Sequence, residues 1–105
     1  MGSVYLLGDW EKEDTYKIGV TRGSVEKRIK KLQTGNGGEI YLVSSYETEK
    51  PFFMEKMLHT KYANNRLEGE WFKLDSEDVI HFRDICKEME GIIEALKDNP
   101  FVSKK

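Results

Sequence analysis

The stretch TYKIGVTRGSVEKRIKKLQTGN (residues 15–36) combines two patterns that decide the fold of this part of the chain. Its first six residues are rich in β-branched and aromatic side chains, which is typical of a strand. Val25, Ile29 and Leu32 then recur at the i, i+4, i+7 spacing of one helix face. Ser24 stands where a helix N-cap is expected, and glycines follow the stripe. The stretch therefore predicts a strand, a turn and an amphipathic helix.

A second strand is predicted before this stretch, at SVYLL (residues 3–7). The polar link GDWEKED between the two strands predicts an antiparallel hairpin with a long loop. Side chains alternate between the two faces of a strand, so Leu6 and Ile18 can share one apolar face. If those faces are buried together, Tyr5 and Lys17 lie together on the other face of the sheet.

Arg28 lies at the edge of the apolar stripe on the predicted helix. On a helical wheel it is about 60° from Val25 and about 40° from Leu32. This position differs from that of a fully solvated base. The same helix carries three lysines that point away from the stripe: Lys27, Lys30 and Lys31.

The rest of the chain predicts further elements in a clear order. IYLVSSY (residues 40–46) is typical of a third strand, and RLEGEWFKL of a turn followed by an extended segment. A helix is expected at residues 51–62, where Glu55 and His59 are i, i+4 partners. Its buried side is expected to comprise Phe53, Met54, Met57 and Leu58. Asp75 is expected to cap a last helix at residues 76–96. This order predicts an α+β domain with a small three-stranded antiparallel sheet flanked by helices, and an additional C-terminal helix.

Composition narrows the class of protein. The chain has 105 residues, a formal net charge of −2 and 34% charged residues, as expected for one globular domain. No apolar run is long enough to span a bilayer, and the first residues lack the pattern of a signal peptide. Cys86 is the only cysteine, which excludes an internal disulfide and indicates a reducing, intracellular compartment. A nucleic-acid partner would have to contact a local basic face.

Each candidate residue also has an ordinary structural interpretation. Tyr5 could be a half-buried strand aromatic, and Lys17 a solvated or edge-guarding strand residue. Glu55 and His59 could be a surface pair that contributes only a few tenths of a kcal/mol, roughly. The combination of these residues and their order along the chain distinguish a functional interpretation from this structural one.

That order resembles the GIY-YIG nuclease superfamily. SVY is followed after about ten residues by KIG, then nine residues later by Arg28 on a helix, and then by Glu55 on a later helix. The compact branch common in phages and viruses offers the most similar motifs. They are YKIG (residues 16–19), Arg28 with LQTGN (residues 32–36), Glu55 with the LH of residues 58–59, and GEWF (residues 69–72).

Some positions depart from the general pattern of that superfamily. Ser3 and Val4 replace the first two residues of the GIY tripeptide, and Lys17 stands where the first tyrosine of YIG is usual. Leu32 occupies a position where many relatives carry histidine or tyrosine. His59 is then the candidate for the missing polar group.

The resemblance implies a role for each matching residue. Tyr5 would position or deprotonate the attacking water, with Lys17 lowering its pKa or contacting phosphate. Arg28 would stabilise the charge that builds up on the phosphate. Glu55 would bind Mg²⁺ or Mn²⁺, and His59 would orient it or transfer protons. Tyr16 and Glu70 are possible accessory residues, whereas Trp71 and Phe72 are expected in the core.

The implied function is that of a metal-dependent endonuclease that cuts or nicks DNA. The nuclease-like domain would span residues 1–75, with residues 76–105 forming a helix packed on it and a short tail. Lys27, Lys30 and Lys31 would attract the DNA backbone. The C-terminal helix could hold a second copy or a protein partner, and the location would be the cytoplasm or nucleus, including that of an infected host cell. Two alternatives are a catalytically inactive nucleic-acid-binding module of the same fold and a protein-interaction adaptor.

Overall fold

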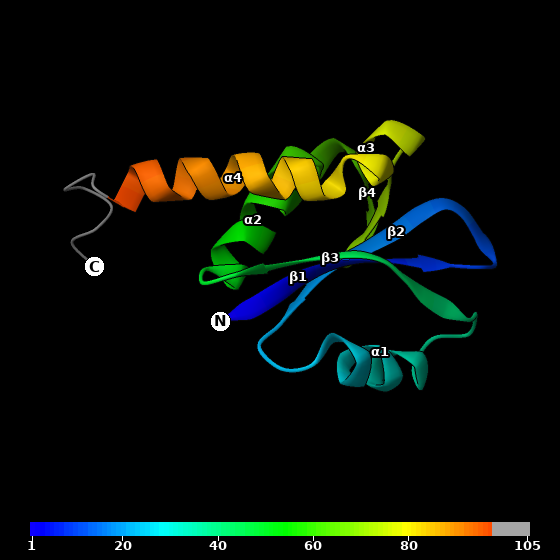
Figure 1. Ribbon diagram of the computed structural model, residues 1–105. Coiled ribbons are helices and arrows are strands. Elements are labelled where there is room, and N and C mark those ends of the chain that lie inside the picture. Colours follow the sequence, from blue (N-terminus) through cyan, green and yellow to red (C-terminus); the bar gives the residue numbers. More distant parts are fainter. Residues whose placement is uncertain (98–105) are drawn as a thin grey trace.

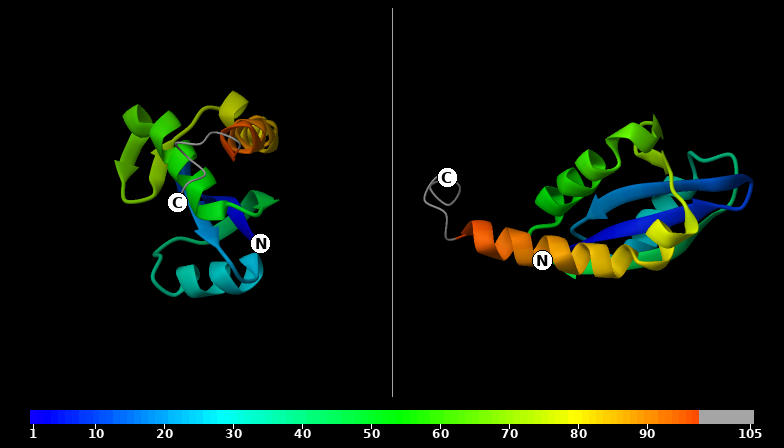
Figure 2. Two further views of the ribbon diagram at one scale, coloured as in Figure 1. Left: turned by 90° about the vertical axis from the view of Figure 1, so that its left-hand side faces the viewer. Right: turned by 90° about the horizontal axis from the view of Figure 1, so that it is seen from above.

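The computed structural model describes residues 1–97, so the predicted tail at residues 98–105 lies outside the described part of the chain. It has the predicted α+β architecture, with one sheet between helices (Figure 1). The elements in chain order are β1 (Gly2–Asp9), β2 (Lys12–Thr21), α1 (Val25–Gln33), β3 (Ile40–Thr48), α2 (Pro51–Lys61), a 3-10 turn (Ala63–Asn65), β4 (Arg66–Glu68), β5 (Trp71–Lys73), α3 (Ser76–Ile80) and α4 (Phe82–Lys97). Helix α1 covers one face of the sheet, whereas α2 and α4 cover the other, as Figure 2 shows from two further directions.

The sheet has five strands in the order β3-β1-β2-β5-β4, all antiparallel to their neighbours, so the prediction of three strands was wrong. The difference comes from RLEGEWFKL, which folds as a hairpin rather than as a turn and one extended segment. Gly69 has a φ of 56°, a left-handed conformation that glycine adopts without strain, and it starts the tight turn between β4 and β5. Strand β5 then pairs with β2 over Thr15–Lys17, and within residues 1–97 no strand pairs with the outer edge of β2 beyond that point.

The link between β1 and β2 is shorter than predicted. The two strands continue into the polar segment and pair as far as Asp9 and Lys12, so only Trp10 and Glu11 connect them. Asp9 Oδ1 accepts a hydrogen bond of 2.9 Å from Glu11 N, which stabilises the turn without a long loop.

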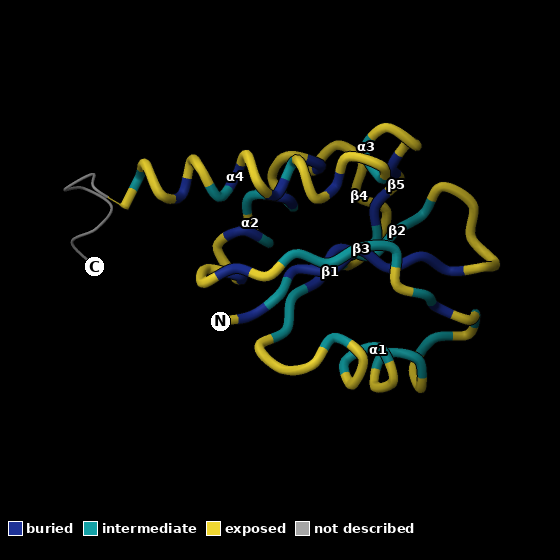
Figure 3. The backbone as a smooth tube through the Cα atoms, viewed as in Figure 1, coloured by how far each residue is buried: buried dark blue, intermediate teal, exposed yellow. Residues whose placement is uncertain are grey.

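Strand alternation separates the two faces of the sheet as predicted, and each face carries its own buried cluster. On the α2 and α4 face, Leu6 and Ile18 belong to a cluster that includes residues of both helices. On the α1 face, Tyr5 packs with residues of α1. In the register of the β1–β2 pair, Tyr5 lies opposite Gly19, and Leu7 lies opposite Lys17, so Tyr5 and Lys17 share a face. Strand β1 is buried along most of its length (Figure 3), and Tyr5 is fully buried rather than half-buried.

Helices α1 and α2 begin where the sequence predicts. Ser24 is the N-cap of α1, and its Oγ accepts a hydrogen bond of 3.3 Å from Lys27 N. Helix α2 begins at Pro51, and Met54 and Leu58 are buried on its inner side. The assignment of Phe53 to that side was wrong, because Phe53 is 39% exposed.

The predicted last helix is divided at His81 into α3 and α4. Asp75 caps α3 as predicted, in a capping box with Asp78. The apolar side of α4 is buried in the core, against β3 and α2, through Phe82, Cys86, Met89 and Ile93. Within residues 1–97, none of the helices has the length and apolar character needed to cross a bilayer.

Candidate functional site

Tyr5 and Arg28 form the centre of the candidate site. The Nε atom of Arg28 donates a hydrogen bond of 3.3 Å to the hydroxyl oxygen of Tyr5, linking α1 to the central strand β1. Tyr5 is fully buried, and Arg28 is partly buried at the edge of the apolar stripe, as its wheel position predicts. This contact holds a cation against a phenol at the boundary between core and solvent.

Gly19 provides the space that the Tyr5 ring occupies. A Cβ atom at position 19 would overlap the Tyr5 hydroxyl oxygen and would lie 2.5 Å from two carbons of the ring, Cε1 and Cζ. Such distances are far below van der Waals contact, so any side chain here would displace the ring. The glycine of KIG therefore sets the position of the tyrosine of SVY.

The backbone of Ile18 connects two other candidate residues to the open edge of β2. Its N–H donates to the carbonyl oxygen of Glu70 at 3.0 Å, and its carbonyl oxygen lies 2.9 Å from Nε2 of His59. Both groups point away from β1, toward the side of β2 on which a further strand would otherwise pair. The KIG segment thus positions Glu70 and His59 through its main chain.

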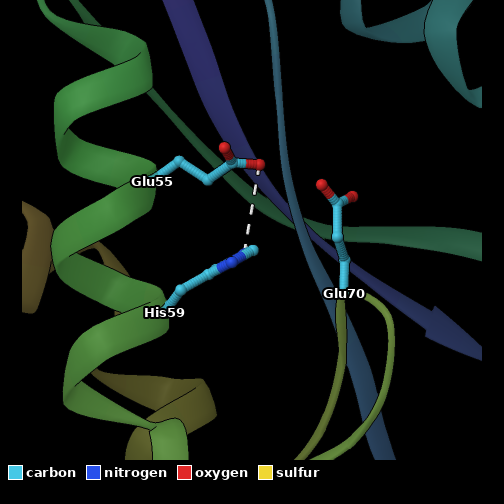
Figure 4. A group of neighbouring side chains, drawn as sticks. All are labelled: Glu55, His59 and Glu70. Atoms are coloured by element: carbon cyan, nitrogen blue, oxygen red, sulfur yellow. Dashed lines mark ion pairs between the residues drawn. The ribbon is translucent and has the colours of Figure 1, made fainter.

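Glu55, His59 and Glu70 lie together at this edge (Figure 4). One ligand-type atom from each of the three side chains lies within 4.8 Å of the others. Glu55 Oε2 is 4.0 Å from His59 Nε2, and the two side chains are only 16% and 17% exposed. Glu70 also lies 3.6 Å from the ammonium group of Lys17, which connects this cluster to the α1 face.

Both ring nitrogens of His59 have partners. The carbonyl oxygen of Ile18 can only accept, so the neighbouring Nε2 carries a hydrogen. The Nη2 group of Arg66 can only donate, and it lies 3.1 Å from Nδ1, which therefore accepts. In this arrangement Nε2 carries a hydrogen and the lone pair of Nδ1 is engaged by Arg66, so His59 holds the cluster in place rather than offering a free lone pair to a metal ion.

The carboxyl group of Glu55 is in an unfavourable environment for a negative charge. Burial, followed by the negative charge of Glu70, raises the pKa of Glu55 to about 7, although Lys17 and Arg28 act in the opposite direction. Within the described residues, Glu55 Oε2 is buried and has no hydrogen-bond partner. An added positive charge would relieve both conditions.

The pKa of Tyr5 corrects one part of the sequence interpretation. Burial raises the pKa of the phenol, and the cation that opposes this increase is Arg28, not Lys17. Lys17 instead pairs with Glu70, because the β4–β5 hairpin brings Glu70 next to β2.

The structure places six of the residues selected from the sequence near one another, in two groups. Arg28 contacts Tyr5, whereas the second group comprises Lys17, Glu55, His59 and Glu70. Burial is the main cause of the raised pKa of Tyr5, and the charges of Glu70 and Glu55 add to it, so the two groups lie within electrostatic reach of each other. Tyr16 lies on the opposite face, where it packs against the α2 and α4 core. The lysines of α1 are exposed on that helix: Lys27, Lys30 and Lys31.

The LQTGN segment has a role that the sequence reasoning missed. Asn36 donates from Nδ2 to Asp9 Oδ2 at 2.9 Å, and Gln33 accepts from Ile40 N at 2.8 Å. Asp9 is only 2% exposed, and its hydrogen bond from Asn36 holds the pKa of its carboxyl group below the ordinary value. These bonds fasten the end of α1, and with it Arg28, to the sheet. Polar residues directly after a helix were the available signal.

Comparison with protein-family models matches residues 2–87 to the T5orf172 domain. No curated protein and no solved structure matches the chain. Because the family match covers most of its length, the chain belongs to the T5orf172 domain family, a family of DNA-binding and nuclease-related domains.

Proposed function

We propose that this protein is a metal-dependent endonuclease that hydrolyses DNA phosphodiester bonds by a GIY-YIG-type mechanism. The observation that carries the proposal is the hydrogen bond from Arg28 to Tyr5 together with the buried Glu55 oxygen, which has no hydrogen-bond partner among the described residues. A phenol, a guanidinium and a buried carboxylate at one site match three needs of phosphodiester hydrolysis. These needs are an oriented nucleophile, charge stabilisation and a cation ligand.

Arg28 and Tyr5 have complementary tasks in this proposal. The guanidinium of Arg28 has further N–H donors besides the one bonded to Tyr5, and these can bind phosphate oxygens. The negative charge on those oxygens increases as the phosphate is attacked, which is when Arg28 stabilises it most. Because burial raises the pKa of Tyr5, its hydroxyl keeps its proton in the free protein and orients the attacking water by hydrogen bonding.

Glu55 and Glu70 are suited to hold a divalent cation. Glu55 Oε2 fits such an ion, because it is a buried carboxylate oxygen without a hydrogen-bond partner among the described residues. The carboxylate of Glu70 lies nearby. Oxygen ligands of this kind are those that Mg²⁺ and Mn²⁺ bind in proteins. When bound, such an ion supplies positive charge to the leaving oxygen. His59 keeps the Glu55 side of the site in place, and Lys17 contacts phosphate.

The direct test is nicking of supercoiled plasmid in the presence and absence of Mg²⁺ or Mn²⁺. Wild type should give metal-dependent nicked product, and Arg28→Ala and Glu55→Gln should not. Glu88→Gln, on the exposed side of α4, is the matched control and should retain activity. If the wild-type protein nicks no more than the two site variants in either metal, the nuclease proposal fails.

A second candidate is a catalytically inactive module that binds nucleic acid. It is favoured by the pKa of Glu55, because a carboxyl group with a pKa of about 7 is partly neutral at physiological pH. This candidate predicts that the wild type binds labelled DNA but gives no nicked product in Mg²⁺ or Mn²⁺.

A further inference from the structure

A groove beside the candidate site is not explained by the roles assigned above. It has a volume of about 310 Å³ and lies between the end of α1, β2 and β5. Its wall includes Lys17, Lys31, Thr34, Asn36, Ile40 and Trp71. A volume near 300 Å³ is at the lower limit for small-ligand pockets, so the groove suits a single small unit rather than a helical segment.

The groove is continuous with the candidate site through one row of side chains. Leu7, Lys17 and Trp71 lie opposite one another on neighbouring strands β1, β2 and β5. Lys17 therefore lines the groove while its ammonium group lies 3.6 Å from Glu70 in the site. A chain whose phosphate lies at Arg28 and Glu55 can continue from the site into the groove.

Trp71 gives the groove an aromatic wall surrounded by positive charge. The ammonium group of Lys12 lies 4.7 Å from the Trp71 ring centre, and that of Lys17 lies 5.6 Å away. The expectation that Trp71 is a core residue was therefore only partly correct, since its ring packs against the α1 core while it also lines the groove. Lysine stems are flexible, so these ammonium groups can move from the ring to a phosphate.

An aromatic ring with mobile lysines is the combination that binds single-stranded nucleic acid. Stacking on the ring requires a free base face, which a base inside a duplex does not offer. We propose that the groove takes one unpaired nucleotide flanking the reacting phosphate, with its base on Trp71 and its phosphate between Lys17 and Lys31. The inference rests on the proposed nuclease function and assigns it a substrate class, DNA with an unpaired segment next to the cut.

The test uses Trp71 as its own reporter. The chain has two tryptophans, and Trp10→Phe leaves Trp71 as the only one. Trp10 is 69% exposed and stacks on Tyr41, outside the groove and the candidate site. Two fluorescein-labelled DNA hairpins, each closed by a non-nucleotide linker so that the loop offers no unpaired base, are compared in EDTA, which prevents cleavage. One is blunt, and the other carries a short thymidine overhang, tested at either strand end. Anisotropy gives the dissociation constant, and Trp71 emission reports stacking.

We expect the overhang to tighten binding by at least about fivefold at one strand end and to quench Trp71 emission. Trp71→Leu should abolish this difference, whereas Trp71→Phe, which keeps an aromatic face, should retain most of it. Lys27→Gln, on the exposed side of α1, should weaken binding of both hairpins equally. Circular dichroism melts of each variant establish that it is folded. If Trp71→Leu does not fold, quenching of Trp71 emission in the Trp10→Phe protein keeps the test decisive.

Two results would overturn the inference. One is a hairpin with an overhang, at whichever strand end, that binds the protein no more tightly than the blunt hairpin does. The other is unchanged Trp71 emission while anisotropy saturates. If the blunt hairpin binds in either case, the proposed function survives and only the groove assignment fails. If neither hairpin binds, the groove assignment fails, and the nicking assay in Mg²⁺ or Mn²⁺ decides the proposed function separately.

Discussion

The Nε atom of Arg28 and the hydroxyl oxygen of Tyr5 are joined by a hydrogen bond of 3.3 Å that connects helix α1 to the central strand. Arg28→Lys retains the positive charge but removes the planar set of donors. We expect the plasmid nicking rate to fall by about 10²- to 10³-fold, while DNA affinity changes much less. Arg22→Lys, at an exposed position before α1, is the matched control. A wild-type nicking rate in Arg28→Lys would show that Arg28 does not act on the phosphate.

Gly19 should be unable to accept even a methyl group. In Gly19→Ala the new Cβ would overlap the Tyr5 ring, so Tyr5 must shift. We expect a loss of about 1–3 kcal/mol in the free energy of unfolding, together with loss of nicking. Urea unfolding measures the first effect.

The control for Gly19→Ala is Gly91→Ala in α4, where a Cβ would meet no atom within 4 Å. It should stabilise the protein by about 0.5–1 kcal/mol, because alanine favours a helix over glycine. Equal effects of the two substitutions would contradict the tight contact between Gly19 and Tyr5.

The raised pKa of Glu55 predicts a pH dependence of stability. Because the folded protein holds this proton up to about pH 7 and an unfolded chain releases it near 4.5, ionisation of Glu55 opposes folding. Stability should therefore decrease as pH rises from about 5 to 8, by on the order of 3 kcal/mol at most. Glu55→Gln should lack this decrease, and Glu88→Gln should keep it.

Measuring stability with added Mg²⁺ at the same pH values tests cation binding without an activity assay. Mg²⁺ should raise the melting temperature of the wild type at pH 8 more than at pH 5, because the ionised carboxylate is the ligand. If Mg²⁺ raises the melting temperature of Glu55→Gln as much as that of the wild type, the cation binds elsewhere.

Asn36 should stabilise the fold through Asp9. Asn36→Ala removes a donor from a carboxylate that is only 2% exposed, so we expect a loss of about 1–3 kcal/mol at neutral pH. The pKa of Asp9 is lowered in the folded protein, so this contribution is present above about pH 4 and is lost as pH falls through the folded pKa. The loss of unfolding free energy caused by Asn36→Ala should therefore become smaller as the solution is made acidic.

Urea unfolding at several pH values measures this loss, with Thr34→Ala, at an exposed hydroxyl, as the control. A cost that does not change with pH would mean that Asp9 is not the partner involved.

The exposed lysines of α1 should affect DNA binding in a way that depends on salt. Lys30→Gln should reduce the slope of log affinity against log salt concentration by about 1, if Lys30 neutralises one phosphate. Lys87→Gln, on α4 across the sheet, should leave the slope unchanged. Identical slopes for both variants and the wild type would exclude Lys30 from the interface.

The sequence by itself determined those features that depend on local backbone geometry. Strand alternation placed Tyr5 and Lys17 on one face, and the helical period placed Arg28 at the edge of the α1 stripe. The Ser24 cap is also local, because it involves atoms only a few residues apart. Periodicity and capping are properties of a short segment, so a short segment is sufficient to predict them.

Only the tertiary structure decided how distant segments meet. Pairing of β5 with β2 depends on a free strand edge and on the turn at Gly69, and it carries Glu70 to Lys17. The motif order singled out Glu55, but its burial and its raised pKa arise from packing at that edge. Long-range strand pairing and desolvation depend on the whole chain, because they are set by what lies across the sheet rather than by neighbours in sequence.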